Sequence, residues 1–106
     1  MANLTVAEVL DRAADLIEPA GAWTQGKWGS PETCMCAEGA IFAACEASPM
    51  YDRNRIPGAI GVLTSMLPAI PRGNPIAFWN DDPERTQAEV VAKLREAAAL
   101  ARERAS

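Results

Sequence analysis

Apolar residues recur every three or four positions in two segments of the chain, one near each end, and this is the spacing of a helical face. The first stripe runs from residue 6 to 17 and ends before Pro19, and the second runs from residue 90 to 101. The pattern predicts two amphipathic helices, the second of which extends to about Arg104. Each is preceded by a capping box, in which a threonine and the glutamate three residues later satisfy free backbone donors. The boxes are Thr5 with Glu8 and Thr86 with Glu89.

The segment between these helices predicts two shorter helices and one helical turn. Residues 36–47 carry glycine and alanine at spacings of three and four, and we expect the ridge of Gly39 and Ala43 to pack closely against a terminal helix. The other expected elements are a stop at Ser48-Pro49, a polar connector over 50–57, a third helix over 58–67 and a single turn over 76–79.

Two segments depart from helical periodicity. Residues 22–33 combine two tryptophans with several glycines and a proline, which predicts a compact irregular loop or a short hairpin around Gly26. Residues 80–83, Asn-Asp-Asp-Pro, are typical of a turn. The predicted fold is all-α, a single domain over residues 1–106 with a bundle of four main helices. We expect the tryptophan-containing loops to pack across one end of it.

Composition and charge narrow the classes of function. The 21 alanines favour helices with a core of small side chains, and 106 residues suit one domain. The absence of histidine excludes Ser-His-Asp and Cys-His catalysis within the chain. Residues 1–50 carry two basic and seven acidic residues, and residues 51–106 carry eight and seven, so nucleic-acid binding is disfavoured. We expect neither a membrane span nor a signal peptide.

The three cysteines, an odd number, suggest reduced thiols in the cytosol. Cys34 and Cys36 are candidate metal ligands, but their Cys-x-Cys spacing and the lack of histidine do not supply a tetrahedral zinc site. Both lie at the start of a predicted helix, where a thiolate is favoured, yet no histidine is present to act as a base. We favour the alternative that Cys36 and Cys45 are small core residues. We therefore predict no metal and no cofactor.

Candidate binding residues gather in the two loops. Exposed tryptophans are frequent hot spots, and Trp28 is the tryptophan expected to be exposed. For the other two tryptophans we favour a core position, with the indole N–H bonded to loop carbonyls. The acidic residues at 81, 82 and 84 could hold a divalent cation, but we favour a turn in which the arginine at 85 bridges to a nearby carboxylate. The candidate binding residues are Trp23, Gln25, Trp28, Trp79, Asn80, Asp81 and Arg85.

Three landmark segments are spread along the chain: Ala22-Trp-Thr-Gln-Gly26, Cys36-Ala-Glu-Gly-Ala-Ile41 and Trp79-Asn-Asp81, the last followed by Arg85-Thr86 and Glu89-Val90. Together they resemble an uncharacterised family of short proteins from actinobacteria and their phages, over most of the chain. The family has no established activity, and the resemblance implies a bacterial or phage cytosolic origin. Relatives have a longer loop between Gly26 and Cys36, so any ligand site on that loop would be reduced here.

Three hypotheses of function follow. The first is a small cytosolic interaction protein that binds a host protein or a second copy of itself. The second is a small-ligand or nucleotide-sequestering protein with a pocket between the tryptophan loop and the proline loop before Trp79. The third is a cysteine- or metal-dependent enzyme. We predict the first, because the chain lacks catalytic pairs, has an acidic N-terminal half and carries a tryptophan-bearing loop.

Overall fold

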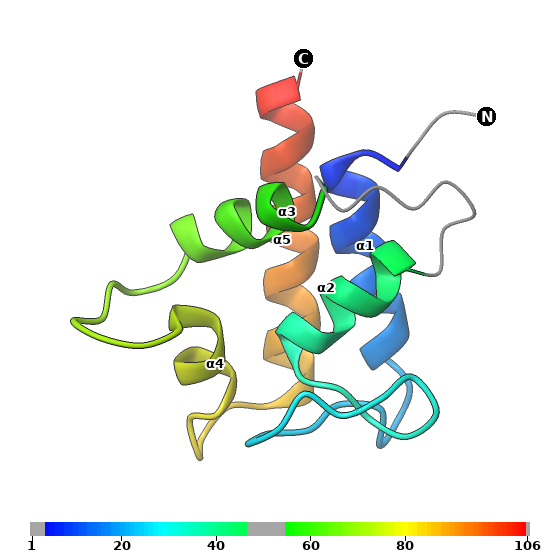
Figure 1. Cartoon of the computed structure of the whole chain (residues 1–106), viewed down its shortest axis with the longest axis vertical. Helices are drawn as coiled ribbons and strands as arrows, with labels where there is room; N and C mark the ends of the chain where they lie inside the picture. Colours follow the sequence, from blue (N-terminus) through cyan, green and yellow to red (C-terminus); the bar gives the residue numbers. More distant parts are fainter. Residues whose placement is uncertain (1–3, 47–54, 106) are drawn as a thin grey trace.

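The computed structural model describes residues 4–46 and 55–105 (Figure 1). This part of the chain forms five helices and contains no β-strand, so the predicted all-α class is confirmed. None of these helices is long and apolar enough to cross a membrane. The helices are α1 (Val6–Ile17), α2 (Ala37–Glu46), α3 (Arg55–Ser65), α4 (Pro75–Asn80) and α5 (Gln87–Ala105).

The two terminal helices lie side by side and antiparallel, and α1 makes its most extensive contacts with α5 (Figure 1). Both predicted capping boxes form, with the Thr5 hydroxyl 3.1 Å from the Glu8 backbone nitrogen and the Thr86 hydroxyl 3.2 Å from that of Glu89. Alanines are fully buried on both helices, and such small side chains let two backbones approach closely. The predicted stripe of α5 is buried throughout: Val90, Leu94, Ala97, Ala98 and Ala101.

Helices α2 and α3 lie across the α1–α5 pair, and α4 packs on both of them (Figure 1). Helix α3 begins at Arg55, three residues before the predicted start, and ends at Ser65, two residues early. Pro57 lies in its first turn, where the missing N–H would have no helical acceptor, so the proline does not prevent helix formation. Residues 47–54 are outside the described part, and they include the predicted stop at Ser48-Pro49.

Residues 22–36 form an irregular loop, and the alternative of a hairpin around Gly26 is wrong. The loop closes through Met35, whose N–H donates to the Ala22 carbonyl at 2.8 Å and whose carbonyl accepts from the Thr24 N–H at 3.0 Å. Isolated bridges join Met35 to Trp23 and to Gly29. These bonds lie at the end of the loop rather than across Gly26, so no pair of strands develops.

Gly39 is buried, as expected, but the neighbour that requires it is a loop and not a helix. A β-carbon at this position would lie 2.6 Å from the carbonyl oxygen of Trp28. The prediction that a Gly39 ridge admits a terminal helix is therefore wrong at this residue. Ala43 of the same predicted ridge is half-buried against the core. The small residue at 39 instead allows the backbone of the tryptophan loop to rest on α2.

An ionic cluster fastens α5 to α1. The Arg95 guanidinium lies 3.1 Å from Asp11, 2.6 Å from Asp15 and 3.3 Å from Glu18, and Arg102 also bonds to Asp11. Burial raises the pKa of Asp11, but hydrogen bonds from Arg102 and Arg95 outweigh it and hold this pKa below its ordinary value of 3.8. The Asp11 carboxylate is therefore stabilised in its charged form by folding.

We expect the protein to lose stability in acid partly through Asp11. A carboxyl group with a lower pKa in the folded state stabilises the fold at high pH, and this contribution disappears as the pH falls from about 4 through the folded-state pKa. The free energy of unfolding is measured in urea at neutral pH and at about pH 3. The loss between the two pH values should be smaller in Asp11→Asn than in wild type. Glu84→Gln removes an exposed carboxylate and is the control. An unchanged acid dependence in Asp11→Asn would contradict this assignment.

Candidate functional site

Asn80, the last residue of α4, is fully buried and joins three segments of the chain. Its side-chain oxygen accepts hydrogen bonds from the Trp23 indole N–H at 2.8 Å and from the Ala37 backbone N–H at 3.0 Å. Its amide nitrogen donates to the Thr24 carbonyl and to an Asp81 side-chain oxygen, both at 3.0 Å. A buried amide is expected to have its polar atoms satisfied, and every polar atom of this one is bonded.

A second set of bonds fastens the loop to the end of α4. The Gln25 amide donates to the Asn80 carbonyl at 3.0 Å and to the Asp82 carbonyl at 2.7 Å, and the Gly26 N–H donates to Asp81 at 2.8 Å. The structure thus brings together four of the predicted binding residues. Their polar groups bond to one another, so these residues support the loop. We call this set, Trp23, Gln25, Asn80 and Asp81, the loop clasp.

Trp79 and Arg85 also bond within the protein. The Arg85 guanidinium carbon lies 4.0 Å from the centroid of the Trp79 ring, and its Nε donates to the Trp79 carbonyl at 3.0 Å. The same side chain forms an ion pair with Glu89 at 3.3 Å and approaches Asp82 at 4.0 Å. The predicted bridge from Arg85 to a carboxylate is confirmed. Trp79 is partly buried against the core, and Trp23 is too, although the indole of Trp23 bonds to a side-chain amide rather than a carbonyl.

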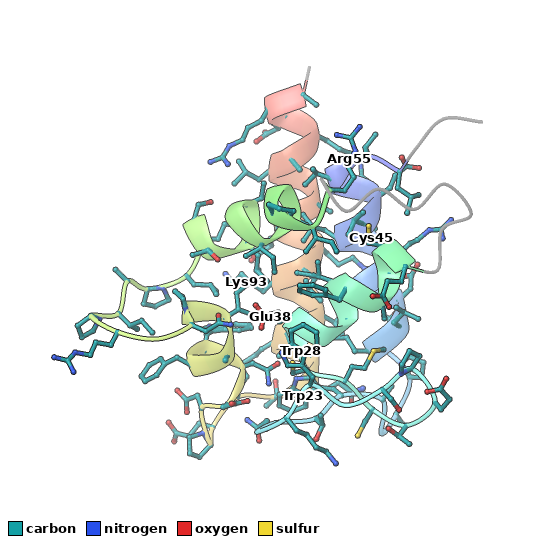
Figure 2. All side chains as sticks on the ribbon, in the orientation of Figure 1. Trp23, Trp28, Glu38, Cys45, Arg55 and Lys93 are labelled. Atoms are coloured by element: carbon teal, nitrogen blue, oxygen red, sulfur yellow. The ribbon has the colours of Figure 1, made fainter. Side chains whose placement is uncertain are left out.

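Trp28 is the candidate tryptophan that remains half-exposed, as expected. Its ring lies against Phe42 of α2, with centroids 4.5 Å apart, and its indole N–H donates to the Glu38 carboxylate at 3.2 Å. Figure 2 shows Trp28 and Glu38 close together near the start of α2. The ring is therefore held in one place while part of its surface faces solvent.

The Glu38 carboxylate is positioned by α4 as well as by Trp28. Asn74 caps the start of α4 by accepting from the N–H groups of Ile76 and Ala77, at 2.9 and 3.3 Å. The amide nitrogen of Asn74 then donates to both oxygens of Glu38 at 2.9 Å. The cap of one helix thus orients a carboxylate that belongs to another helix.

Two adjoining hollows follow the exposed side of α4, and we call them together the α4 groove. The smaller has a volume of about 140 Å³ and is lined by Trp28, Glu38 and Asp81 among others. The larger, of about 540 Å³, includes Phe78, which is 68% exposed. Both hollows are lined by Ala77 and Asp81, so they meet at α4.

The charges of the α4 groove are mainly fixed carboxylates. Glu38 and Asp81 accept hydrogen bonds from neutral donors, and within the described residues neither forms an ion pair. Asp82 also lines the larger hollow. The basic residues of the lining, Lys27 and Arg72, are exposed side chains on loops. A cationic group would therefore find oriented acceptors here.

Cys34 and Cys36, the candidate metal ligands, do not have the surroundings of a reactive or metal-binding pair of cysteines. Burial raises the pKa of Cys36 above its ordinary value, and the Gly39 N–H donates to its sulfur at 3.4 Å. A thiol with a raised pKa is protonated at neutral pH and is a poor nucleophile. Cys45 is buried and Cys34 is half-buried, and within the described residues none of the three cysteines forms a disulfide. In the described residues, no three groups of the type that bind metals gather in one place.

Sequence reasoning missed Glu38, Asn74 and Phe78. Asn74 before Pro75 is a recognisable cap signal. Phe78 lies two residues from both Ile76 and Asn80, which are buried, so helical spacing places it on the opposite side of the turn. No local signal indicates Glu38, because its role depends on partners at positions 28 and 74.

A family model described as a family of unknown function (DUF6197) matches residues 1–100 of the chain. Comparison with curated proteins gives no match, and comparison with solved structures gives none either.

Proposed function

The chain belongs to the family of unknown function DUF6197, and we propose that it is a protein-interaction module whose α4 groove receives an arginine side chain of a partner protein. The observation that carries this proposal is the pair of carboxylates, Glu38 and Asp81, held by neutral donors beside the half-exposed ring of Trp28.

The two carboxylates favour a guanidinium because they are already oriented. Glu38 is held through both of its oxygens by Asn74, so little side-chain freedom is lost when a cation binds. Carboxylates accept two parallel hydrogen bonds from the planar guanidinium, which an ammonium cannot offer in the same geometry. The face of a tryptophan also attracts a guanidinium by cation–π interaction.

The aromatic residues provide the apolar part of the interface. Trp28 and Phe78 are the exposed large hydrophobic residues of the described chain, and both line the α4 groove. Tryptophan is enriched among residues whose truncation strongly weakens protein complexes. A partner segment with an arginine next to apolar side chains therefore matches both components of this surface.

Nucleotide binding is the second candidate, and the charges of the groove argue against it. Phosphates would face Glu38, Asp81 and Asp82, and like charges at short range are repulsive. Trp79, one of the aromatic residues expected to line such a pocket, stacks on Arg85 instead. A cysteine enzyme is disfavoured by the protonated state of Cys36.

The setting that we propose for this interaction is the cytosol of an actinobacterium, with a phage or its host as the source of the chain. The landmark segments support this setting, and cysteines that form no disulfide among the described residues are compatible with a reducing compartment.

A peptide experiment tests the proposal. The probe is a fluorescent peptide with one arginine between apolar residues, compared with the same peptide carrying citrulline, which has the shape of arginine without its charge. We expect saturable binding of the arginine peptide and at least tenfold weaker binding of the citrulline peptide. Trp28→Ala should weaken binding by roughly 30-fold, as expected for the loss of about 2 kcal/mol at a hot spot.

Glu38→Gln tests whether the negative charge of Glu38 contributes to peptide binding, and Glu84→Gln is its matched control. We expect Glu38→Gln to weaken binding of the arginine peptide about tenfold and Glu84→Gln, outside both hollows, to leave it unchanged. The proposal is overturned if wild type binds the arginine and citrulline peptides equally, or if Glu38→Gln binds the arginine peptide as tightly as wild type does. Sedimentation of wild type and Trp28→Ala then shows whether the partner is a second copy of the chain.

A further inference from the structure

A second cavity lies at the other end of the molecule, away from the α4 groove. It has a volume of about 620 Å³ and is lined by residues of α1, α3 and α5 and by Thr5. Figure 2 shows Arg55, one of its lining residues, at the end where α5 finishes, whereas Trp23 and Trp28 lie toward the opposite end. The volume is within the range of small-molecule sites.

The cavity exists because the helices carry small residues where their walls face it. Helix α3 contributes Gly58, and α5 contributes Ala101 and Ala105. A β-carbon on Gly58 would lie 2.9 Å from a methyl carbon of Val6, so α1 and α3 are already in close contact at this point. Val6 and Val62 complete an aliphatic surface that includes Ala101.

Among the residues that the structure describes, the charged ones that line the cavity are all arginines. They are Arg55 at the start of α3 and Arg102 and Arg104 in the last turns of α5. The carboxylates of α1 that face this end are engaged: Glu8 bonds to the Thr5 backbone, and Asp11 bonds to Arg102 and Arg95. Glu103 follows Arg102 on α5 and is absent from the lining. A basic rim over an aliphatic floor is notable in a chain with a net charge of −4.

We propose that this cavity binds a single-chain amphiphile with an anionic head, a class that includes fatty acids. The aliphatic chain lies against Val6, Val62 and Ala101, where burial of each methylene is favourable by about 0.8 kcal/mol. The carboxylate or phosphate head faces the exposed guanidinium of Arg104, and a guanidinium binds such anions through paired hydrogen bonds. Arg102 adds positive charge beside it while its own guanidinium is bonded to Asp11. This proposal is independent of the arginine-binding function of the α4 groove.

Calorimetric titration of the full chain with decanoate tests this proposal. Decyltrimethylammonium and decanol have the same chain with a cationic or a neutral head. We expect one molecule of decanoate per chain, with at least tenfold weaker binding of the other two. Circular dichroism monitors the helices during each titration. No saturable binding of decanoate, equal binding of all three compounds, or uptake of many molecules with loss of helicity would overturn the proposal.

Two variants locate the bound molecule. Ala105→Trp fills the cavity from an exposed position, and Ala99→Trp places the same side chain on an exposed position of α5 outside it. Arg104→Glu reverses one charge of the rim. We expect Ala105→Trp and Arg104→Glu to weaken decanoate binding at least tenfold, and Ala99→Trp and Trp28→Ala to leave it unchanged. If Ala105→Trp and Arg104→Glu both bind decanoate as tightly as wild type, the proposed location is wrong.

Discussion

Replacement of Asn80 by alanine should destabilise the protein by about 4 kcal/mol. The substitution leaves the Trp23 indole N–H, the Ala37 N–H and the Thr24 carbonyl without the partner that they have in the folded protein. A buried polar group that loses its partner costs about 1–3 kcal/mol, and bonds that share one amide are not independent. Thermal unfolding should show a Tm lower by roughly 20 °C.

Gln25→Ala is the control for this prediction. Gln25 also donates to the end of α4, but it is exposed, so water can replace the bonds that it makes. We expect Gln25→Ala to cost less than about 1 kcal/mol. Asn80→Asp retains the acceptor oxygen but places a second oxygen against Thr24 and Asp81, and it should also be strongly destabilising. A cost for Asn80→Ala close to that of Gln25→Ala would show that the clasp does not hold the fold.

Gly29→Ala should be the second most disruptive substitution, with a cost of about 3 kcal/mol. Gly29 has a φ of +77°, which side chains with a β-carbon rarely adopt, and an added β-carbon would lie 1.7 Å from the Cys34 carbonyl oxygen. The loop must therefore shift, and the bond from the Ser30 N–H to that same oxygen is lost. Local backbone strain and steric overlap of this kind cost a few kcal/mol.

Gly26→Ala separates the two causes, because Gly26 has nearly the same φ of +78° but open space around its β-carbon position. We expect Gly26→Ala to cost only about 1 kcal/mol, from backbone conformation alone. Gly29→Ala should also weaken binding of the arginine peptide, because it displaces the neighbouring Trp28. Equal unfolding free energies for the two variants, measured in urea, would show that the contact with Cys34 is unimportant.

The loop clasp gives a physical account of two of the three landmark segments. Ala22-Trp-Thr-Gln-Gly26 provides the indole, the carbonyl and the amide that bond to the end of α4, and Trp79-Asn-Asp81 provides their partners. These residues were candidates for binding a partner protein or a ligand. In the folded chain they hold the loop so that Trp28 stays beside Glu38. The interaction surface that we propose therefore depends on the clasp but lies next to it.

The sequence by itself determined the two terminal helices and where they begin, because these depend on local interactions. The capping boxes at Thr5 and Thr86 and the buried stripe of α5 involve residues within a few positions of each other or a repeated apolar pattern. The exposure of Trp28 and the burial of Cys36 and Cys45 were also predicted correctly. The start of α3 was missed because of Pro57. The sequence near a proline looks the same whether the proline lies in the first turn of a helix or in a connector.

Only the tertiary structure decided which residues face one another. Three of the four partners of the Asn80 side chain lie 43 to 57 residues away along the chain, and those of Glu38 lie 10 and 36 residues away. Gly39 shows the same limit. Its burial followed from the sequence, but the sequence did not predict that its neighbour would be the Trp28 carbonyl. Hydropathy and local propensity specify how much of a residue is buried. The identity of its partner depends on how distant segments pack, and in this protein that packing creates both the α4 groove and the arginine-rimmed cavity.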